Sequence, residues 1–189
     1  MNYQEDLKKA VEVLQQGGLI LYPTDTFWGI GCDATNAEAV RKVYELKKQE
    51  DRSSMTMLVD SDVRFNSYVE EVPEIAYDLI ELAVKPLTVI FSGGKNLPDN
   101  LLNEDGSIGI RVTKEPFSWA LCQKFRKPVI WTSANVEGEA SPGGFDEISE
   151  TILGGVDYVV NYRQDEVESP VPFGIIKLEV DGQVQIIKE

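Results

Sequence analysis

The sequence predicts an α/β protein built on a twisted, mixed open sheet with flanking helices. Short apolar runs alternate along the chain with segments of helical periodicity, which is typical of an α/β sheet. The last two apolar runs, in "GIIKLEVDGQVQII", flank Asp181-Gly182, a signature of a tight hairpin, so at least one strand pair is antiparallel. The length of 189 residues, without internal repeats, fits one domain.

In the first half of the chain, the pattern predicts helices and strands in alternation. Apolar residues at helical spacing predict a helix over 7–14 that Gly17-Gly18 ends. The run "LILY" predicts a buried strand over 19–22. Asn36 is expected to cap a second helix, and a third is expected to begin near Pro73. The further strands expected in this half are 55–59, 87–91 and 108–112.

The second half continues the alternation. It predicts a helix over 116–126, a strand over 129–132, a short helix over 145–153, a strand over 157–160 and the C-terminal hairpin. The polar stretch 161–173 is expected to form a loop over one face. All these elements are assigned to a single domain, 1–189.

Composition excludes several kinds of chemistry. The chain has no histidine, which removes Ser-His-Asp and Cys-His catalysis and most zinc sites. Its 18 Lys and Arg against 32 Asp and Glu give a net charge of −14, which disfavours an extended RNA or membrane footprint but allows a local cationic pocket. Cys32 and Cys122 are interpreted as buried, reduced thiols. No signal peptide is expected, and no apolar run reaches membrane-spanning length.

Small polar side chains follow two of the expected strands. Thr24 and Thr26 flank Asp25 in "YPTDTFWGIGCD", and Ser133 and Asn135 follow "VIWT". Each motif alone is equally typical of a capped turn, because Thr, Ser, Asn and Asp favour turns. Their recurrence at strand ends favours a site for a small polar ligand, because α/β sheets commonly bind ligands there.

Cations stand at two further places. Arg111 alternates with Ile110 and Val112 inside an apolar strand, where a charge needs a partner or a ligand. Lys47 and Arg52 lie in "ELKKQEDRSSM", where cations that complement a helix C-terminus are the simpler interpretation. Taken with the strand ends, they favour a site for an anionic ligand. One cleft is therefore expected to be lined by Lys47, Arg111, Ser133, Asn135, Thr24 and Thr26.

Together these motifs resemble the YrdC family, the threonylcarbamoyl-AMP synthases. The resemblance runs from Gly17 to about Lys188. Its landmarks are weak singly and specific in combination: Pro23-Thr24-Asp25-Thr26, Lys47, "PLT" at 86–88, "IRVT" at 110–113, "TSAN" at 132–135 and "SP" at 141–142. The resemblance implies a YrdC-like sheet around a central concave, locally cationic cleft.

The resemblance also implies an activity. Members of the family join L-threonine, bicarbonate or CO₂, and ATP into threonylcarbamoyl-adenylate and pyrophosphate, and the adenylate serves the modification of a tRNA adenosine. This implies ATP as a substrate with Mg²⁺, downstream tRNA-modification proteins as partners, and a cytoplasmic location without membrane attachment. Direct RNA binding is weakly indicated, because the net charge is −14. The reaction needs no histidine, since a carbamate attacks the α-phosphorus and the protein mainly positions reactants.

The family pattern assigns residues to the site. Catalytic roles fall on Lys47, Ser133 and Asn135. Contacts with ATP or threonine fall on Thr24, Thr26, Arg52, Arg111, Thr113, Thr132 and Ala134. No metal ligand is assigned. Hydroxyl, amide and cationic side chains suit a reaction that depends on positioning and on neutralising phosphate charge.

Four places depart from that pattern. Gln49 replaces the arginine of a K-x-R motif, Ser53 a second basic residue, and Trp131 a serine. Phe173-Gly174 replaces a pair of hydroxyl residues. The loss of one bidentate phosphate contact weakens binding about tenfold to a hundredfold. Two interpretations follow: a synthase that these changes impair, or a pocket-altered, non-catalytic relative that binds a nucleotide, a small ligand or RNA.

Trp131 admits two interpretations of its own. As a strand residue it can simply belong to the core. The period of two along a strand instead places it on the same side as Ser133. We therefore favour the interpretation in which the indole narrows the substrate pocket.

Overall fold

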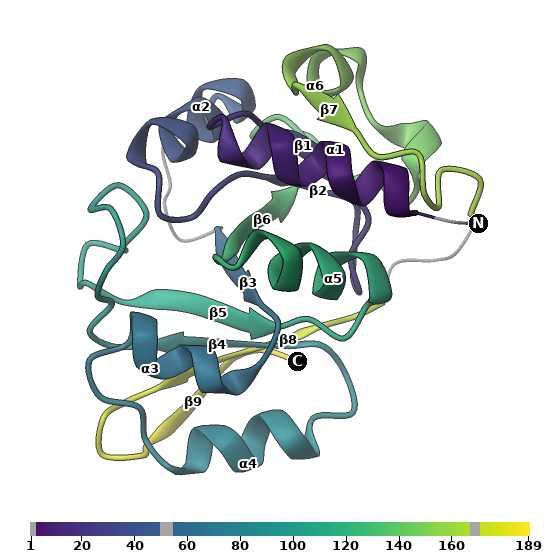
Figure 1. The fold of residues 1–189 in the computed structure, drawn as a ribbon. Coiled ribbons are helices and arrows are strands. Elements are labelled where there is room, and N and C mark those ends of the chain that lie inside the picture. Colours follow the sequence, from purple (N-terminus) through teal and green to yellow (C-terminus); the bar gives the residue numbers. More distant parts are fainter. Residues whose placement is uncertain (1–2, 50–54, 167–170) are drawn as a thin grey trace.

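Nine strands form one mixed sheet in the computed structural model, which describes residues 3–49, 55–166 and 171–189 (Figure 1). They are β1 (Ile20–Tyr22), β2 (Gly29–Gly31), β3 (Thr56–Val59), β4 (Leu87–Phe91), β5 (Ile108–Val112), β6 (Val129–Ser133), β7 (Tyr158–Val159), β8 (Gly174–Leu178) and β9 (Val184–Lys188). Their order is β7-β1-β2-β6-β3-β5-β4-β8-β9. Pairs β1–β7, β3–β5 and β4–β8 are parallel and the others antiparallel, which confirms the predicted mixed sheet.

Helices flank this sheet, as predicted. They are α1 (Gln4–Gln15), α2 (Ala37–Lys47), α3 (Phe65–Tyr68), α4 (Ile75–Leu82), α5 (Pro116–Phe125) and α6 (Glu150–Gly155). Figure 1 shows α1 and α5 side by side over the strands, with α3 and α4 toward the other end of the sheet. An edge-on contact between Tyr3 and Phe117, with ring centroids 5.8 Å apart, joins the start of α1 to α5.

Local sequence signals set several boundaries. The Asn36 side chain caps α2 by accepting hydrogen bonds from the backbone N–H groups of Glu38 and Ala39. Gly17 adopts a left-handed φ of +72° just after α1, a conformation that only glycine takes without strain. Gly182 does the same, with a φ of +85°, at the turn of the β8–β9 hairpin. These three predicted stops and caps are confirmed.

Three elements differ from the prediction, the first being the short helix α3, which no pattern indicated. The stretch 145–153 is split into a 3₁₀ turn at Phe145–Glu147 and the helix α6, rather than forming one helix. Residues 29–31 form the strand β2 instead of belonging entirely to a loop. Flanking glycines hide this strand in the sequence, because glycine weakens a strand pattern and is typical of turns.

The register across the middle of the sheet separates the core from the site. Ile130, Met57 and Ile110 stand side by side on β6, β3 and β5, and all three are fully buried. Side chains alternate along a strand, so the next residues in sequence, Trp131 and Arg111, point to the opposite face. That face carries the residues discussed below.

Candidate active site beside the strand ends

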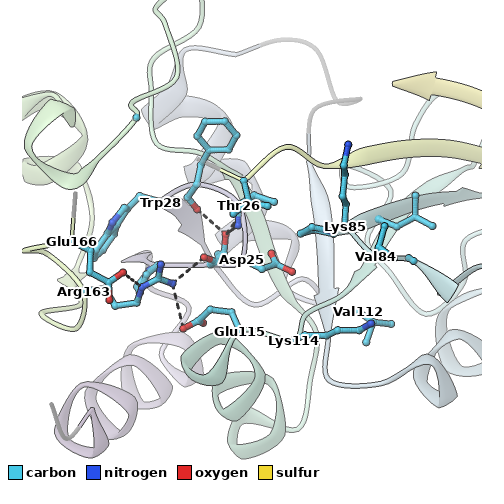
Figure 2. Close-up of a pocket in the computed structure, with 18 of the residues that line it drawn as sticks. Asp25, Thr26, Trp28, Val84, Lys85, Val112, Lys114, Glu115, Arg163 and Glu166 are labelled. Atoms are coloured by element: carbon cyan, nitrogen blue, oxygen red, sulfur yellow. Dashed lines mark hydrogen bonds and ion pairs between the residues drawn. The ribbon is translucent and has the colours of Figure 1, made fainter. Parts of the chain in front are cut away.

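A cavity of about 410 Å³ lies beside the turn that joins β1 to β2. Further segments complete its wall: the connection from α4 to β4, the end of β5 with the residues before α5, Gly143 and Gly144 in the connection after β6, and the loop after β7. Its polar and charged lining residues are Thr24, Asp25, Thr26, Lys85, Lys114, Glu115, Arg163 and Glu166. Figure 2 shows these residues, except Thr24, around the cavity on separate elements. The cavity therefore offers both anionic and cationic side chains to the charged groups of a small polar ligand.

The turn after β1 is fixed by its own hydroxyl groups. Thr24 Oγ1 donates to the carbonyl oxygen of Phe27 (2.7 Å) and accepts from the backbone N–H of Thr26 (3.2 Å). The hydroxyl oxygens of Thr24 and Thr26 lie 3.3 Å apart, and both residues are buried. Such side-chain-to-backbone bonds are the turn-forming property of threonine. They hold Asp25, the central residue of the turn, against the cavity.

Glu115 and Arg163 form the opposite side of the cavity. Glu115 caps α5, since its Oε2 accepts from the backbone N–H of Ser118 (2.7 Å) and from the Ser118 hydroxyl (2.9 Å). Its Oε1 lies 3.6 Å from Arg163 Nη1. Arg163 Nη1 also donates to the carbonyl oxygen of Thr24 (3.2 Å), and Nε pairs with Glu166. Arg163 therefore connects the loop after β7 to the turn at Thr24 and to Glu115 at the start of α5 (Figure 2).

Burial shifts the acid–base properties of the two carboxylates. Burial raises the pKa of Asp25, against the opposing effect of the Arg111 guanidinium, whose Nη2 lies 3.4 Å from Asp25 Oδ1. Burial likewise raises the pKa of Glu115, against the hydrogen bonds from Ser118. Both groups protonate more readily than ordinary carboxylates. Perturbed carboxylates in a cavity are a feature of functional sites.

The remaining cavity charges are more exposed. Lys85, before β4, and Lys114, after β5, line the cavity and are solvent-exposed. Figure 2 places both on the side away from Arg163. Because these two ammonium groups are exposed, they can neutralise an anionic group without the desolvation cost that a buried lysine carries.

A second cluster of predicted site residues lies at the end of β6. Lys47 Nζ donates to the carbonyl oxygens of Ser133 (2.5 Å) and Asn135 (2.7 Å). Burial lowers the pKa of Lys47 to about 8, against the opposing charge of Glu137. The Asn135 amide donates to the carbonyl oxygens of Val136 (3.1 Å) and Glu139 (3.0 Å). Lys47, Ser133 and Asn135 are therefore close together, as expected from the sequence. Lys47 contacts the other two residues through their backbone carbonyl oxygens.

The cavity and this cluster are not one continuous lining. Of the six residues expected to share one cleft, Thr24 and Thr26 line the cavity, and Lys47, Arg111, Ser133 and Asn135 do not belong to the lining found among the described residues. Strand direction accounts for the distance between Arg111 and Ser133, because β6 runs antiparallel to β3 and β3 is parallel to β5, so the carboxyl ends of β5 and β6 lie at opposite edges of the sheet. It does not separate Thr24 and Thr26 from Ser133, because β1 and β6 are both antiparallel to β2.

Arg111 lies behind the cavity wall. Arg111 is fully buried, and its guanidinium carbon lies 4.6 Å from the centre of the Trp131 ring and 5.6 Å from the centre of the Phe173 ring. Trp131 shares the strand β6 and the same face with Ser133, as the period of two predicted. It is only 5% exposed and packs against Arg111 and Phe173 rather than lining the cavity.

The other assigned residues are mostly internal. The Thr113 hydroxyl bonds to the Ser118 hydroxyl (2.7 Å), beneath the start of α5. Thr132 and Ala134 are each 1% exposed. Arg52 and Ser53 lie outside the described residues.

Several cavity residues were missed by the sequence analysis. Asp25 was noted only as the centre of a turn, although its carboxylate faces the cavity. Glu115, directly before Pro116, carried a helix-start signal that also places it at a strand end. Arg163 lies in the stretch 161–173, where no periodicity or motif distinguishes it from a solvated loop residue. Cys32 and Cys122 are buried free thiols, as predicted, and burial raises the pKa of Cys122 to about 12.

The described part of the chain holds neither a membrane-spanning helix nor a cluster of metal-ligating side chains. Residues 3–49, 55–166 and 171–189 contain no helix that is long and apolar enough to cross a bilayer. Within the same ranges, no group of three or more His, Cys, Asp or Glu side chains is arranged to hold a metal ion.

The fold and cavity define an α/β protein with a cavity of mixed charge beside the turn that follows its first strand. The chain belongs to the Sua5/YciO/YrdC family, whose model, described as "Telomere recombination", matches residues 12–189. The resemblance inferred from the short motifs is therefore confirmed.

Relatives of known name support this membership. A protein of Methanocaldococcus jannaschii is 33% identical over 188 residues, covering 97% of this chain and 87% of its own. A threonylcarbamoyl-AMP synthase of Coxiella burnetii is 32% identical over 139 residues, covering 73% of this chain and 75% of its own. A threonylcarbamoyl-AMP synthase of Pseudoalteromonas translucida is 29% identical over 164 residues, covering 85% and 88%.

Solved structures show the same fold. The crystal structure of E. coli YciO matches with a TM-score of 0.84 and 25% identity, covering 98% of this chain and 89% of that chain. P. abyssi Sua5 in complex with L-threonine matches with a TM-score of 0.83 and 21% identity. The present chain covers 52% of the Sua5 chain, so it corresponds to about half of that longer protein.

Proposed function

We propose that this chain is an ATP-dependent L-threonylcarbamoyladenylate synthase that serves the biosynthesis of threonylcarbamoyladenosine in tRNA. Membership of the Sua5/YciO/YrdC family and the names of its relatives support the proposal. The observation that carries it is the cavity, in which Asp25 and Glu115 oppose Arg163, Lys85 and Lys114. This distribution of charge suits an amino acid zwitterion next to a phosphate group.

The proposed chemistry begins with a carbamate. The amine of L-threonine and bicarbonate combine with loss of water, and an oxygen of the carbamate then attacks the α-phosphorus of ATP. The bond from that phosphorus to the bridging oxygen breaks, and pyrophosphate leaves. The protein contributes position and charge, because neither step needs a covalent enzyme intermediate. Mg²⁺ enters with ATP, held by phosphate oxygens and water, as is usual for this ion.

Individual residues are proposed to divide this work. Asp25 and Glu115 hold the ammonium group of threonine before carbamate formation, in a pocket shaped by Thr24 and Thr26. Lys85, Lys114 and Arg163 neutralise phosphate oxygens. Near the end of β6, Ser133 and Asn135 are proposed to meet the nucleotide, and Lys47 positions them through their carbonyl groups. Arg52, Thr113, Thr132 and Ala134 keep their expected assignment to ATP and threonine binding.

The proposal includes partners and a compartment. The unstable adenylate has to be consumed by downstream tRNA-modification proteins, and bicarbonate is its carbon source. Two buried free thiols are compatible with a reducing cytoplasm. Direct RNA binding has little support, because the chain carries a net charge of −14.

One observation favours a second candidate function. The burial of Arg111 between Trp131 and Phe173 favours a pocket-altered relative that binds a small ligand without forming an adenylate. Pyrophosphate release from ATP separates the two. The synthase requires release that depends on both threonine and bicarbonate and that falls in Asp25→Asn. Threonine binding without such release identifies the second function, and absence of both binding and release contradicts the synthase proposal.

A further inference from the structure

Arg111 is a buried cation without a hydrogen-bond acceptor. Its Nε, Nη1 and Nη2 atoms are all buried, and none has an acceptor within the described part of the chain. Its nearest counter-charge is Asp25, at 3.4 Å from Nη2, beyond the usual distance of a charged hydrogen bond. Burial lowers the pKa of Arg111, and the Asp25 charge opposes this effect. A guanidinium in this environment needs compensation from its surroundings.

Two aromatic rings supply that compensation. The guanidinium carbon lies 4.6 Å from the Trp131 ring centre and 5.6 Å from the Phe173 ring centre, both within cation–π range. The two rings meet edge to face, with centroids 5.8 Å apart. Phe27 extends the cluster, since its ring lies edge-on to Phe173 at 6.3 Å and its carbonyl oxygen accepts from Trp131 Nε1 (3.3 Å). We call Trp131, Phe173 and Phe27 the aromatic enclosure.

The indole of this enclosure fits a space that the backbone leaves for it. Gly29 on β2 pairs with Ser133 on β6. A Cβ atom added to Gly29 would lie 2.3 Å from Trp131 Cδ1. The absence of a side chain at Gly29 therefore leaves room for the indole beside β2. Trp131 thus contacts both Gly29 and Arg111.

Arg111 is separated from the cavity. Asp25 and, from the aromatic enclosure, Phe27 belong to the cavity lining, whereas Trp131, Phe173 and the fully buried Arg111 do not. The Arg111 charge opposes the burial that raises the pKa of Asp25, and so favours the carboxylate form of Asp25.

We propose that Trp131 and Phe173 are specificity-determining residues: they cover the Arg111 guanidinium and keep it from phosphate oxygens, so that Asp25 receives an ammonium or other hydrogen-bond-donating group at this subsite. The inference rests on the proposed function in one respect, since it concerns the same substrates. Polyphosphate oxygens then have to be held elsewhere, at the exposed Lys85 and Lys114.

The first test uses the unmodified protein. Phenylglyoxal modifies accessible arginine side chains, and mass spectrometry of peptides reports each position separately. Arg41 and Arg126 are exposed and serve as internal references. Arg111 is expected to stay unmodified after both references have reacted completely, with or without added inorganic pyrophosphate. Modification of Arg111 at the rate of the references, or protection of Arg111 by pyrophosphate, overturns the proposal.

The second test opens the enclosure. Phe173→Ser and Trp131→Ser, singly and combined, are titrated with inorganic pyrophosphate by calorimetry. The combined variant is expected to bind pyrophosphate about tenfold to a hundredfold more tightly than the unmodified chain, the scale of a charge-assisted contact. Adding Arg111→Gln should abolish that gain. No gain in a variant whose unfolding stays cooperative, or a gain that persists with Arg111→Gln, overturns the proposal.

A matched control removes an aromatic side chain elsewhere. Tyr77 on α4 packs on Phe65, with ring centroids 6.2 Å apart, and lies outside both the cavity lining and the aromatic enclosure. Tyr77→Ser is expected to leave pyrophosphate affinity unchanged. If the opened variants do not fold, the labelling of the unmodified chain still decides the question. Failure of the synthase function is detected separately, as missing pyrophosphate release from ATP.

Discussion

The ammonium of Lys47 at the end of α2 is bonded to the carbonyl oxygen of Ser133 at the end of β6, 2.5 Å away and 86 residues later in the chain. It donates equally to Asn135 O, and the backbone N–H of Glu137 donates back to Lys47 O (2.8 Å). These bonds join a helix end to the turn that carries two proposed nucleotide contacts. Lys47 is therefore a structural clamp, and its removal should lower the free energy of unfolding.

Lys47→Met is expected to lower the free energy of unfolding by about 2–4 kcal/mol, because it leaves two partly buried carbonyl groups without their charged donor. Urea denaturation measures this change. Lys48→Met is the matched control, since Lys48 is the next residue and is exposed. Its effect should stay within about 0.5 kcal/mol, as for ordinary surface substitutions. Equal stability of the two variants would show that the clamp contributes nothing.

The clamp should also make stability depend on pH. The pKa of Lys47 is lowered from its usual 10.5 to about 8 by burial, so between these values the folded chain loses a proton that the unfolded chain keeps. The unfolded state then binds more protons, and the free energy of unfolding rises with pH across this window. Urea denaturation at several pH values should show this rise in the unmodified chain relative to Lys47→Met. A parallel pH dependence in both proteins contradicts the lowered pKa.

Threonine affinity should fall on acidification earlier than an ordinary aspartate would dictate. Burial raises the pKa of Asp25, so its carboxylate is lost at higher pH than usual, and the ammonium of threonine then loses its counter-charge. Arg111 and Arg163, which face Asp25, stay charged throughout this range. Calorimetric titration with L-threonine over a pH series measures the effect.

Two variants assign that pH dependence. Asp25→Asn should bind threonine weakly and nearly independently of pH, whereas Glu115→Gln should keep the dependence that comes from Asp25. If Glu115→Gln alone removes the pH dependence, Glu115 rather than Asp25 is the group that binds the ammonium.

A further prediction concerns Gln49, which the sequence motif is expected to place at an arginine position. Its backbone N–H donates to the carbonyl oxygen of Tyr44 (3.0 Å), which fixes it just beyond α2. Gln49→Arg is expected to raise ATP affinity by about tenfold, the value of one charge-assisted contact. Gln49→Lys adds the same charge without the planar donor fork and should give less. Unchanged affinity in both variants would show that the missing arginine does not limit binding.

The fold was largely predictable because its elements carry strong local signals. Asn36 and the Asp181-Gly182 turn mark boundaries by backbone chemistry, which acts within a few residues. β2 was missed because its Gly29-Ile30-Gly31 sequence is short and glycine-rich, and only its pairing with β1 and β6 makes it a strand. Such pairing is not encoded within the segment itself.

The site was predictable only in part. Thr24 and Thr26 were expected because they follow a strand end, and the Lys47–Ser133 pair was expected from motifs at the end of a helix and of a strand. The cavity lining depended on the packing of turns and loops that are distant in sequence, which the motifs do not encode. Arg163 reaches Thr24 from 139 residues away, and no pattern in its loop predicts that contact.

The last prediction couples Gly29 to Trp131. A Cβ at Gly29 would lie 2.3 Å from Trp131 Cδ1 and 2.4 Å from Nε1, and the indole also packs against Arg111 and Phe173. Gly29→Ala is therefore expected to destabilise the chain by about 1–3 kcal/mol, the usual cost of overpacking. Trp131→Ser alone should cost about 3–5 kcal/mol, since a buried ring is removed.

In the double variant the two costs should not add, because the serine leaves room for the alanine methyl group. Urea denaturation of the four proteins in this cycle measures the coupling. Additive costs would mean that the clash at Gly29 is relieved by backbone movement rather than by displacement of the indole. The indole would then not be held rigidly over Arg111, and its role in excluding anions from that arginine would lose its structural basis.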